Sequence, residues 1–100
     1  MQKKVREFVE RRGLSCGETN RYLDLVSEVG ELGKELLRGT DYGKQPFRIP
    51  PTLQGEMGDC LFSLLALCDE LGIDAQTALD GALAKYERRF ENTGDAGSGR

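Results

Sequence analysis

The chain has 100 residues, enough for one domain, with 31% charged residues, no histidine and a formal net charge of −3 at pH 7. A mildly acidic chain of this kind offers no broad positive surface for DNA or RNA. The lack of histidine excludes histidine general bases, cysteine–histidine dyads and histidine-rich zinc sites, and it argues against a di-iron bundle built on Glu-x-x-His motifs.

Four helical segments are predicted, with little sign of strands. The first covers about residues 2–12 and ends at Gly13. The second runs from near Thr19, a good N-cap residue, to Arg38, and Gly39 is expected to supply its C-cap. Its apolar residues keep the helical period: Tyr22, Val26, Val29, Leu32 and Leu36.

The third helix is predicted from about Thr52 to Leu71, after two prolines and before Gly72. Its apolar residues point around nearly the whole circumference, and a helix that is apolar on all sides must be covered on all sides. Three other helices in one chain would struggle to cover it. We therefore predict a homodimer whose third helices share a core.

Asp74 is predicted to cap a fourth helix that ends near Asn92. The expected fold is an all-α, four-helix bundle over residues 1–92, assembled as a homo-oligomer. The glycine-rich tail at 93–100 has no large apolar group and is expected to be disordered.

The segment from Gly39 to Pro51 connects the second and third helices. Loops of about a dozen residues without structure of their own are often functional. Its aromatic residues, with Lys44 and Arg48, could hold a base and a phosphate, but they could equally decorate a surface loop.

The apolar run from Cys60 to Cys68 is far shorter than the ~20 residues of a membrane-spanning helix, and no apolar stretch follows the charged first residues. Three cysteines without a Cys-x-x-Cys spacing are typical of free thiols in a reducing compartment. We therefore expect a cytoplasmic protein with no membrane partner and no nucleic-acid partner.

A short acidic motif occurs twice, as Glu28-Val29-Gly30-Glu31 and as Glu56-Met57-Gly58-Asp59. Carboxylates three residues apart on a helix share one face. If the two helices are antiparallel neighbours, Glu31 lies roughly 10 Å before the end of one and Glu56 roughly 6 Å into the other. The four acids then meet at similar depth, where they repel one another unless a cation lies between them.

The alternative is a solvated acidic stripe, which Asp24, Glu28, Glu31 and Glu35 could form on the second helix. It fits Glu56 and Asp59 less well, because ionised groups beside an apolar surface are costly unless they are paired or bind a metal. Carboxylate oxygens suit Mg²⁺, with Mn²⁺ also possible, and such a site points to phosphate chemistry with metal-activated water.

The segments SEVGELGKEL, GEMGDCLFSLLALCDELGID and KYERRF resemble the MazG-type nucleotide pyrophosphohydrolases of the all-α NTP pyrophosphatase superfamily, over roughly residues 20–92. The resemblance implies an all-α fold that forms dimers or higher oligomers. It also implies Mg²⁺-dependent hydrolysis of nucleoside triphosphates between the α and β phosphates, which gives a monophosphate and pyrophosphate.

The resemblance makes the acids of both motifs the catalytic metal ligands: Glu28, Glu31, Glu56 and Asp59. Lys85 and Arg89 match a basic pair that contacts phosphates, and Lys44 or Arg48 could assist them. The alternative for Lys85 and Arg89 is an exposed charged turn that complements a helix C-terminus.

Two positions depart from the family pattern. Ser27 stands where many members have a glutamate, which leaves the general base unassigned. Ala82, Leu83 and Ala84 replace an asparagine that often precedes the basic segment, which leaves nucleotide selectivity open. The competing interpretations are a narrow-specificity dCTP or phosphoribosyl-ATP pyrophosphohydrolase, and a non-catalytic metal-binding helical dimer.

Overall fold

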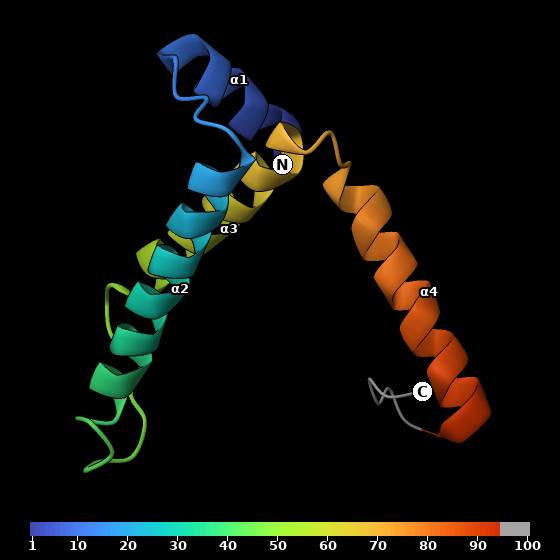
Figure 1. Cartoon of the computed structure of the whole chain (residues 1–100). Helices are drawn as coiled ribbons and strands as arrows, with labels where there is room; N and C mark the ends of the chain where they lie inside the picture. The colour runs from blue at the N-terminus through green and yellow to red at the C-terminus, as the bar shows by residue number, and fades with distance from the viewer. Residues whose placement is uncertain (95–100) are drawn as a thin grey trace.

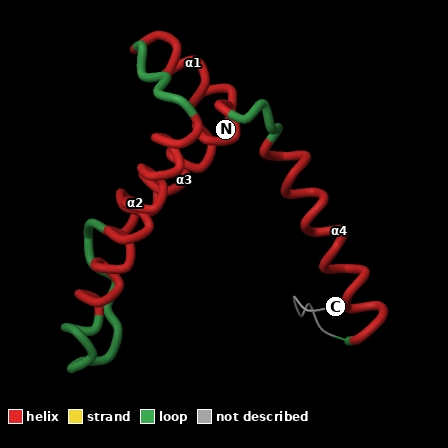
Figure 2. The backbone as a smooth tube through the Cα atoms, viewed as in Figure 1, coloured by secondary structure: helices red, strands yellow, loops and turns green. Residues whose placement is uncertain are grey.

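The computed structural model of the chain describes residues 1–94, and within them it contains four helices and no strand (Figures 1 and 2). The helices are α1 (Gln2–Arg12), α2 (Glu18–Gly39), α3 (Leu53–Glu70) and α4 (Ala75–Thr93). The predicted all-α class is therefore confirmed. Of the tail expected at 93–100, Thr93 ends α4, Gly94 follows it, and 95–100 lie outside the described residues.

Local sequence signals set two of the helix ends as predicted. Gly13 ends α1 with a φ of 64°, a left-handed conformation that glycine adopts without strain. Asp74 caps α4, where its carboxylate accepts hydrogen bonds from the Thr77 backbone N–H at 2.9 Å and from the Thr77 hydroxyl at 2.7 Å. These bonds, the side-chain bond first, hold the pKa of Asp74 below its ordinary value.

Both predicted ends of α2 differ from the structure. The N-cap is Gly17, with a φ of 86°, so Thr19 lies inside the first turn. The helix continues through Gly39, which is buried because the chain folds back over it. The Arg48 N–H donates to the Gly39 carbonyl at 2.7 Å, and a Cβ on Gly39 would lie 2.4 Å from the Phe47 ring. Close approach, not a helix cap, therefore explains this glycine.

We expect Gly39→Ala to lower the stability of the chain by about 1–3 kcal/mol, the usual cost of overpacking. The added methyl would also lie 2.9 Å from the Arg48 carbonyl, so backbone as well as the Phe47 ring must shift. Thermal unfolding followed by circular dichroism tests this. Gly33→Ala is the control, because a Cβ there meets nothing within 4 Å. Equal melting temperatures for the two variants would contradict the close contact.

Helices α2 and α3 pack along each other in opposite directions and form the body of the chain (Figure 1). Hydrogen bonds join the pair at both ends: Ser15, just before α2, donates to Glu70 at 2.9 Å, and Thr52, the N-cap of α3, donates to Glu35. This packing fixes the two helices in antiparallel register.

Helix α1 lies across the C-terminal half of α3. The rings of Phe8 and Phe62 meet edge to face, with centroids 6.1 Å apart. Arg21 is buried beside them, with its guanidinium 5.7 Å from the Phe62 ring and a hydrogen bond to the Leu14 carbonyl. Among the described residues, only Leu65 and Ala66 are buried apolar residues. The core of a single chain is therefore small.

Helix α4 points away from the other helices, so the chain has the outline of an inverted V with the α3–α4 connection at its apex (Figure 1). The radius of gyration is 16.9 Å, whereas a compact domain of this length has roughly 13 Å. The four predicted helices are present, but within one chain they do not close into a bundle.

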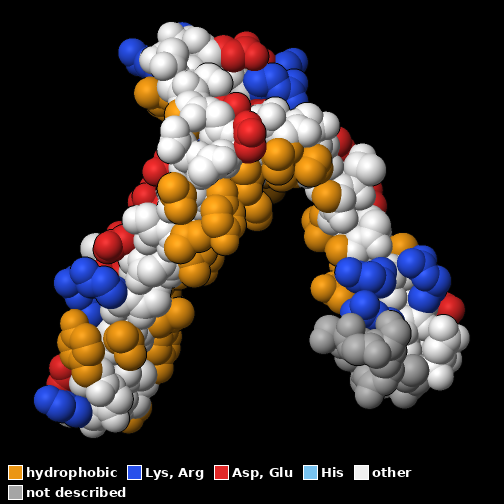
Figure 3. Space-filling model, viewed as in Figure 1, with side chains coloured by type: hydrophobic (Ala, Val, Ile, Leu, Met, Phe, Trp, Pro, Cys, Tyr) orange, Lys and Arg blue, Asp and Glu red, His pale blue; other side chains and the backbone are white. Residues whose placement is uncertain are grey.

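Apolar side chains are exposed on both arms of the V. Leu61 and Leu64 of α3 are 41% and 45% exposed, and Leu79 and Leu83 of α4 are each 53% exposed. Apolar side chains gather on the facing sides of the two arms (Figure 3). Within residues 1–94, no helix combines the length and the hydropathy needed to cross a bilayer.

Candidate metal centre

The antiparallel packing of α2 and α3 brings three carboxylates together. Glu28 lies on α2, and Glu56 and Asp59 lie one turn apart on α3. Each offers a carboxylate oxygen, and these oxygens lie within 4.8 Å of one another. Within residues 1–94, these three acids form the single group with the spacing of a metal site. We call them the acidic cluster.

Glu31, the fourth predicted ligand, lies outside the acidic cluster. It is exposed, and its carboxylate pairs with Lys34 of the same helix at 3.8 Å. Residues three apart on a helix are rotated by about 60° from each other. Glu28 can therefore face α3 while Glu31 points to the side of the contact between α2 and α3. Its charge still acts on Glu28.

The electrostatics of the cluster are those of crowded like charges. Burial raises the pKa of Glu28, and the carboxylates of Asp59, Glu56, Glu31 and Asp24 raise it further, in that order. A divalent cation would reverse this effect, since every carboxylate would then face a positive charge. Carboxylate oxygens are the usual protein ligands of Mg²⁺ and Mn²⁺. The residues present therefore fit a hard divalent cation.

Cys60, one turn after Glu56 on α3, borders the acidic cluster, and its apolar type gave no sign of this in the sequence. Burial raises the pKa of its thiol, and the charges of Glu28, Glu56 and Asp59 raise it further. The thiol is not part of the group of three whose ligand atoms lie within 4.8 Å of one another. The cluster thus presents oxygen ligands alone.

Glu35 does not belong to a solvated acidic stripe, one alternative that the sequence allows, because it is buried, with 7% of its surface exposed. Its carboxylate accepts hydrogen bonds from Arg38 at 3.0 Å and from the hydroxyl of Thr52. This contact ties the start of α3 to α2, two turns from Glu28. It positions Glu56, which lies in the first turn of α3.

The predicted phosphate-binding residues lie apart from the acidic cluster. Lys85 and Arg89 are on α4, the separate arm of the V, where both cations lie over the Tyr86 ring, at 5.3 Å and 5.7 Å from its centroid. Lys44 and Arg48 are exposed in the connection after α2, beyond Gly39. Gly39 itself is roughly 16 Å along the helix axis from Glu28. A single chain therefore gathers the acids without these cations.

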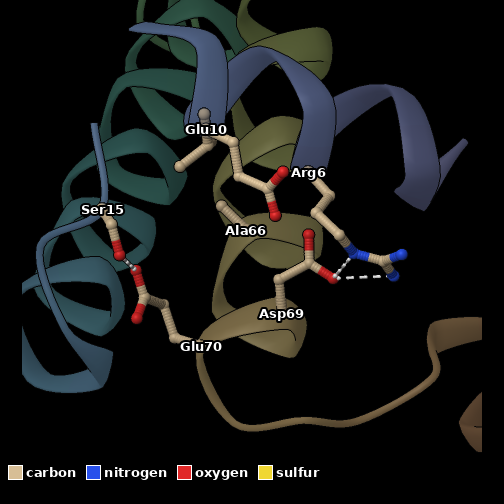
Figure 4. Close-up of a pocket in the computed structure, with 7 residues that line it drawn as sticks. Arg6, Glu10, Ser15, Ala66, Asp69 and Glu70 are labelled. Atoms are coloured by element: carbon tan, nitrogen blue, oxygen red, sulfur yellow. Dashed lines mark hydrogen bonds and ion pairs between the residues drawn. The ribbon is translucent and has the colours of Figure 1, made fainter. Parts of the chain in front are cut away.

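A separate cavity of about 180 Å³ lies between α1, the segment before α2 and the end of α3 (Figure 4). Two pairs of its polar side chains join these elements. Arg6 pairs with Asp69 at 3.3 Å, and Ser15 donates to Glu70, which lowers the pKa of that carboxyl. The cavity therefore belongs to the attachment of α1.

The chain is similar to a known protein family. The family model described as the MazG nucleotide pyrophosphohydrolase domain matches residues 17–93, a range that covers α2, α3 and α4 and leaves out α1. No curated protein and no solved structure matches the chain.

Proposed function

The chain belongs to the MazG nucleotide pyrophosphohydrolase family, and from this premise we propose that it is a cytoplasmic, Mg²⁺-dependent enzyme that acts on nucleoside triphosphates. It hydrolyses an NTP or dNTP between the α and β phosphates, so that the products are a nucleoside monophosphate and pyrophosphate. The observation that carries the proposal is the convergence of Glu28, Glu56 and Asp59 within 4.8 Å.

The acidic cluster would hold the cation, with Glu31 as a further carboxylate beside it. A divalent cation bound there polarises phosphate oxygens and lowers the pKa of water. Glu28 and Glu56 are half-buried and come from two packed helices. Their positions are therefore set before substrate binds, which reduces the cost of ordering the site.

Lys85 and Arg89 are proposed to contact the phosphates, assisted by Lys44 or Arg48. A triphosphate carries several negative charges, and cations placed beside it offset the charge that develops when the bond to the leaving pyrophosphate breaks. The Tyr86 ring between Lys85 and Arg89 keeps the two cations on one side of α4.

A screen of ordinary and modified triphosphates, with dCTP and phosphoribosyl-ATP included, tests the proposal. Phosphorus NMR should show a monophosphate and pyrophosphate when Mg²⁺ is present, and no turnover after chelation. A chain that accepts only dCTP or only phosphoribosyl-ATP would be a narrow-specificity enzyme of the same class. Release of orthophosphate and a diphosphate would contradict the proposed bond cleavage.

Ser27 favours the second candidate, a metal-binding helical dimer without catalytic activity. The residue lies directly before Glu28 on α2 and brings no carboxylate to the position. Binding of Mn²⁺ without hydrolysis of any triphosphate in the panel would support this candidate over the enzyme.

The active form is proposed to be a homo-oligomer. The chain exposes 7391 Å², whereas a compact monomer of its mass exposes roughly 5,700 Å². The excess is roughly 1,700 Å², comparable to the area that each chain of an obligate homodimer loses to its partner. A second copy that covers the exposed apolar side chains of both arms would account for this excess.

A further inference from the structure

One side chain of α1 holds the connection between α3 and α4. The Gln2 amide nitrogen donates to the Asp69 carboxylate and to the Ile73 carbonyl, both at 2.8 Å. The Gln2 amide oxygen accepts from the Ala75 N–H at 2.7 Å. We call these three hydrogen bonds the Gln2 clamp. They join the end of α3, the connection at 71–74 and the first residue of α4.

The Gln2 clamp is fixed from the α1 side as well. Arg6, one turn after Gln2, pairs with the same Asp69 carboxylate at 3.3 Å. The Asp74 cap rigidifies the first turn of α4. The direction in which α4 leaves the body of the chain is therefore specified by hydrogen bonds from α1, a helix outside the matched range of 17–93.

The two arms carry the acids and the cations at matching heights below the apex. Glu56 lies 14 residues before the end of α3 at Glu70, and Arg89 lies 14 residues after the start of α4 at Ala75. At 1.5 Å per residue, both are roughly 21 Å from the connection. A two-fold axis parallel to the bisector of the V but displaced from its plane would set each arm of one copy beside the opposite arm of the other and preserve these heights.

The surfaces next to these charged groups also correspond. Val29 and Met57, which follow Glu28 and Glu56 in sequence, are 54% and 53% exposed, so the acidic cluster borders an apolar face. On α4 the basic side chains gather in the C-terminal half, beside apolar ones (Figure 3). The apolar surface beside the acidic cluster and the apolar side of α4 are therefore complementary in charge, because acids border the first and cations border the second.

We infer that Gln2 is a positioning residue: it holds α4 away from its own α3, so that α4 packs on a second copy of the chain and places Lys85 and Arg89 at that copy's acidic cluster. The inference rests on the proposed function and identifies the partner that completes the site. Each site then consists of acids from one chain and cations from the other.

Subunit complementation tests the exchange of α4. Glu56→Gln and the double variant Lys85→Ala/Arg89→Ala are each expected to be inactive alone. Coexpressed with different affinity tags and purified as mixed dimers, they should recover about half of the wild-type activity, because one of the two sites combines intact acids with intact cations.

The outcomes separate the inference from the proposed function. An active wild type with inactive mixed dimers places acids and cations in the same chain and overturns the inference alone. Full activity of the Lys85→Ala/Arg89→Ala chain also overturns it, since the pair is then not part of the site. A wild type that hydrolyses no triphosphate overturns the proposed function and the inference with it.

The role of the clamp is tested by Gln2→Ala, which removes its three hydrogen bonds. We expect the protein concentration needed for half-maximal activity to rise at least tenfold, with activity recovered at high concentration. Gln76→Ala is the control, because the Gln76 amide bonds to Asp80 within α4. An unchanged concentration dependence for Gln2→Ala would show that the clamp does not position α4 for its partner.

Discussion

Glu56→Gln is expected to reduce pyrophosphate release by roughly 10²–10³-fold or more, because it removes one charge from the oxygen cluster that stabilises the reaction. The folded oligomer should persist. Without metal the variant should melt at the same temperature as the wild type or slightly higher, since Glu56 is one of the carboxylates that raise the pKa of Glu28. Loss of activity with retained stability separates a site residue from a structural one.

Glu7→Gln is the matched control for this variant. Glu7 lies on the exposed side of α1 and pairs with Lys3 at 3.9 Å. It should keep full activity, because its charge is remote from the acidic cluster. Mg²⁺ at a hundredfold excess over its Kd should raise the free energy of unfolding of the wild type by about 2.7 kcal/mol, and its melting temperature with it. The same addition should have little effect on Glu56→Gln. A fully active Glu56→Gln chain would count against the site.

Leu83→Glu is expected to convert the oligomer to monomers and to abolish activity with it. Leu83 is 53% exposed on the apolar side of α4, and a carboxylate buried in an apolar interface costs several kcal/mol, roughly a hundredfold or more in the dissociation constant. Sedimentation velocity on the variant measures the change directly.

Ala84→Glu provides the control for the added charge. Ala84 follows Leu83 in sequence, is also exposed, and lies about 100° further around α4. It should leave the oligomer in place by the same measurement. If Leu83→Glu sediments as the wild type does, the apolar side of α4 is not the contact between copies.

Part of the fold follows from local sequence signals. Gly13 and Asp74 set helix ends through backbone geometry and capping, which depend on a few neighbouring residues. Gly39 could not be interpreted in this way. Its apparent role as a C-cap is replaced by a contact with Phe47, which the sequence alone does not reveal because it depends on the return path of the chain.

The repeated acidic motif was enough to predict that α2 and α3 bring carboxylates together. It was not enough to say which ones, because the rotation of α2 about its axis depends on packing along the whole helix. Glu28 therefore faces Glu56 and Asp59, whereas Glu31 pairs with Lys34.

The position of α4 has no local signature in the sequence. The apolar circumference of α3 indicates that something must cover it, but the sequence of α4 does not distinguish packing on its own chain from packing on a second one. The decisive contacts come from Gln2, which is separated by 67 to 73 residues from the groups it holds. Such contacts can be found only in the structure.

The central claim is that Glu28, Glu56 and Asp59 bind one divalent cation between α2 and α3. An anomalous difference map from a crystal soaked in Mn²⁺ tests it most directly. The account predicts a peak within coordination distance of all three carboxylates. A map without a peak there, in which the carboxylates turn apart into solvent, would contradict it.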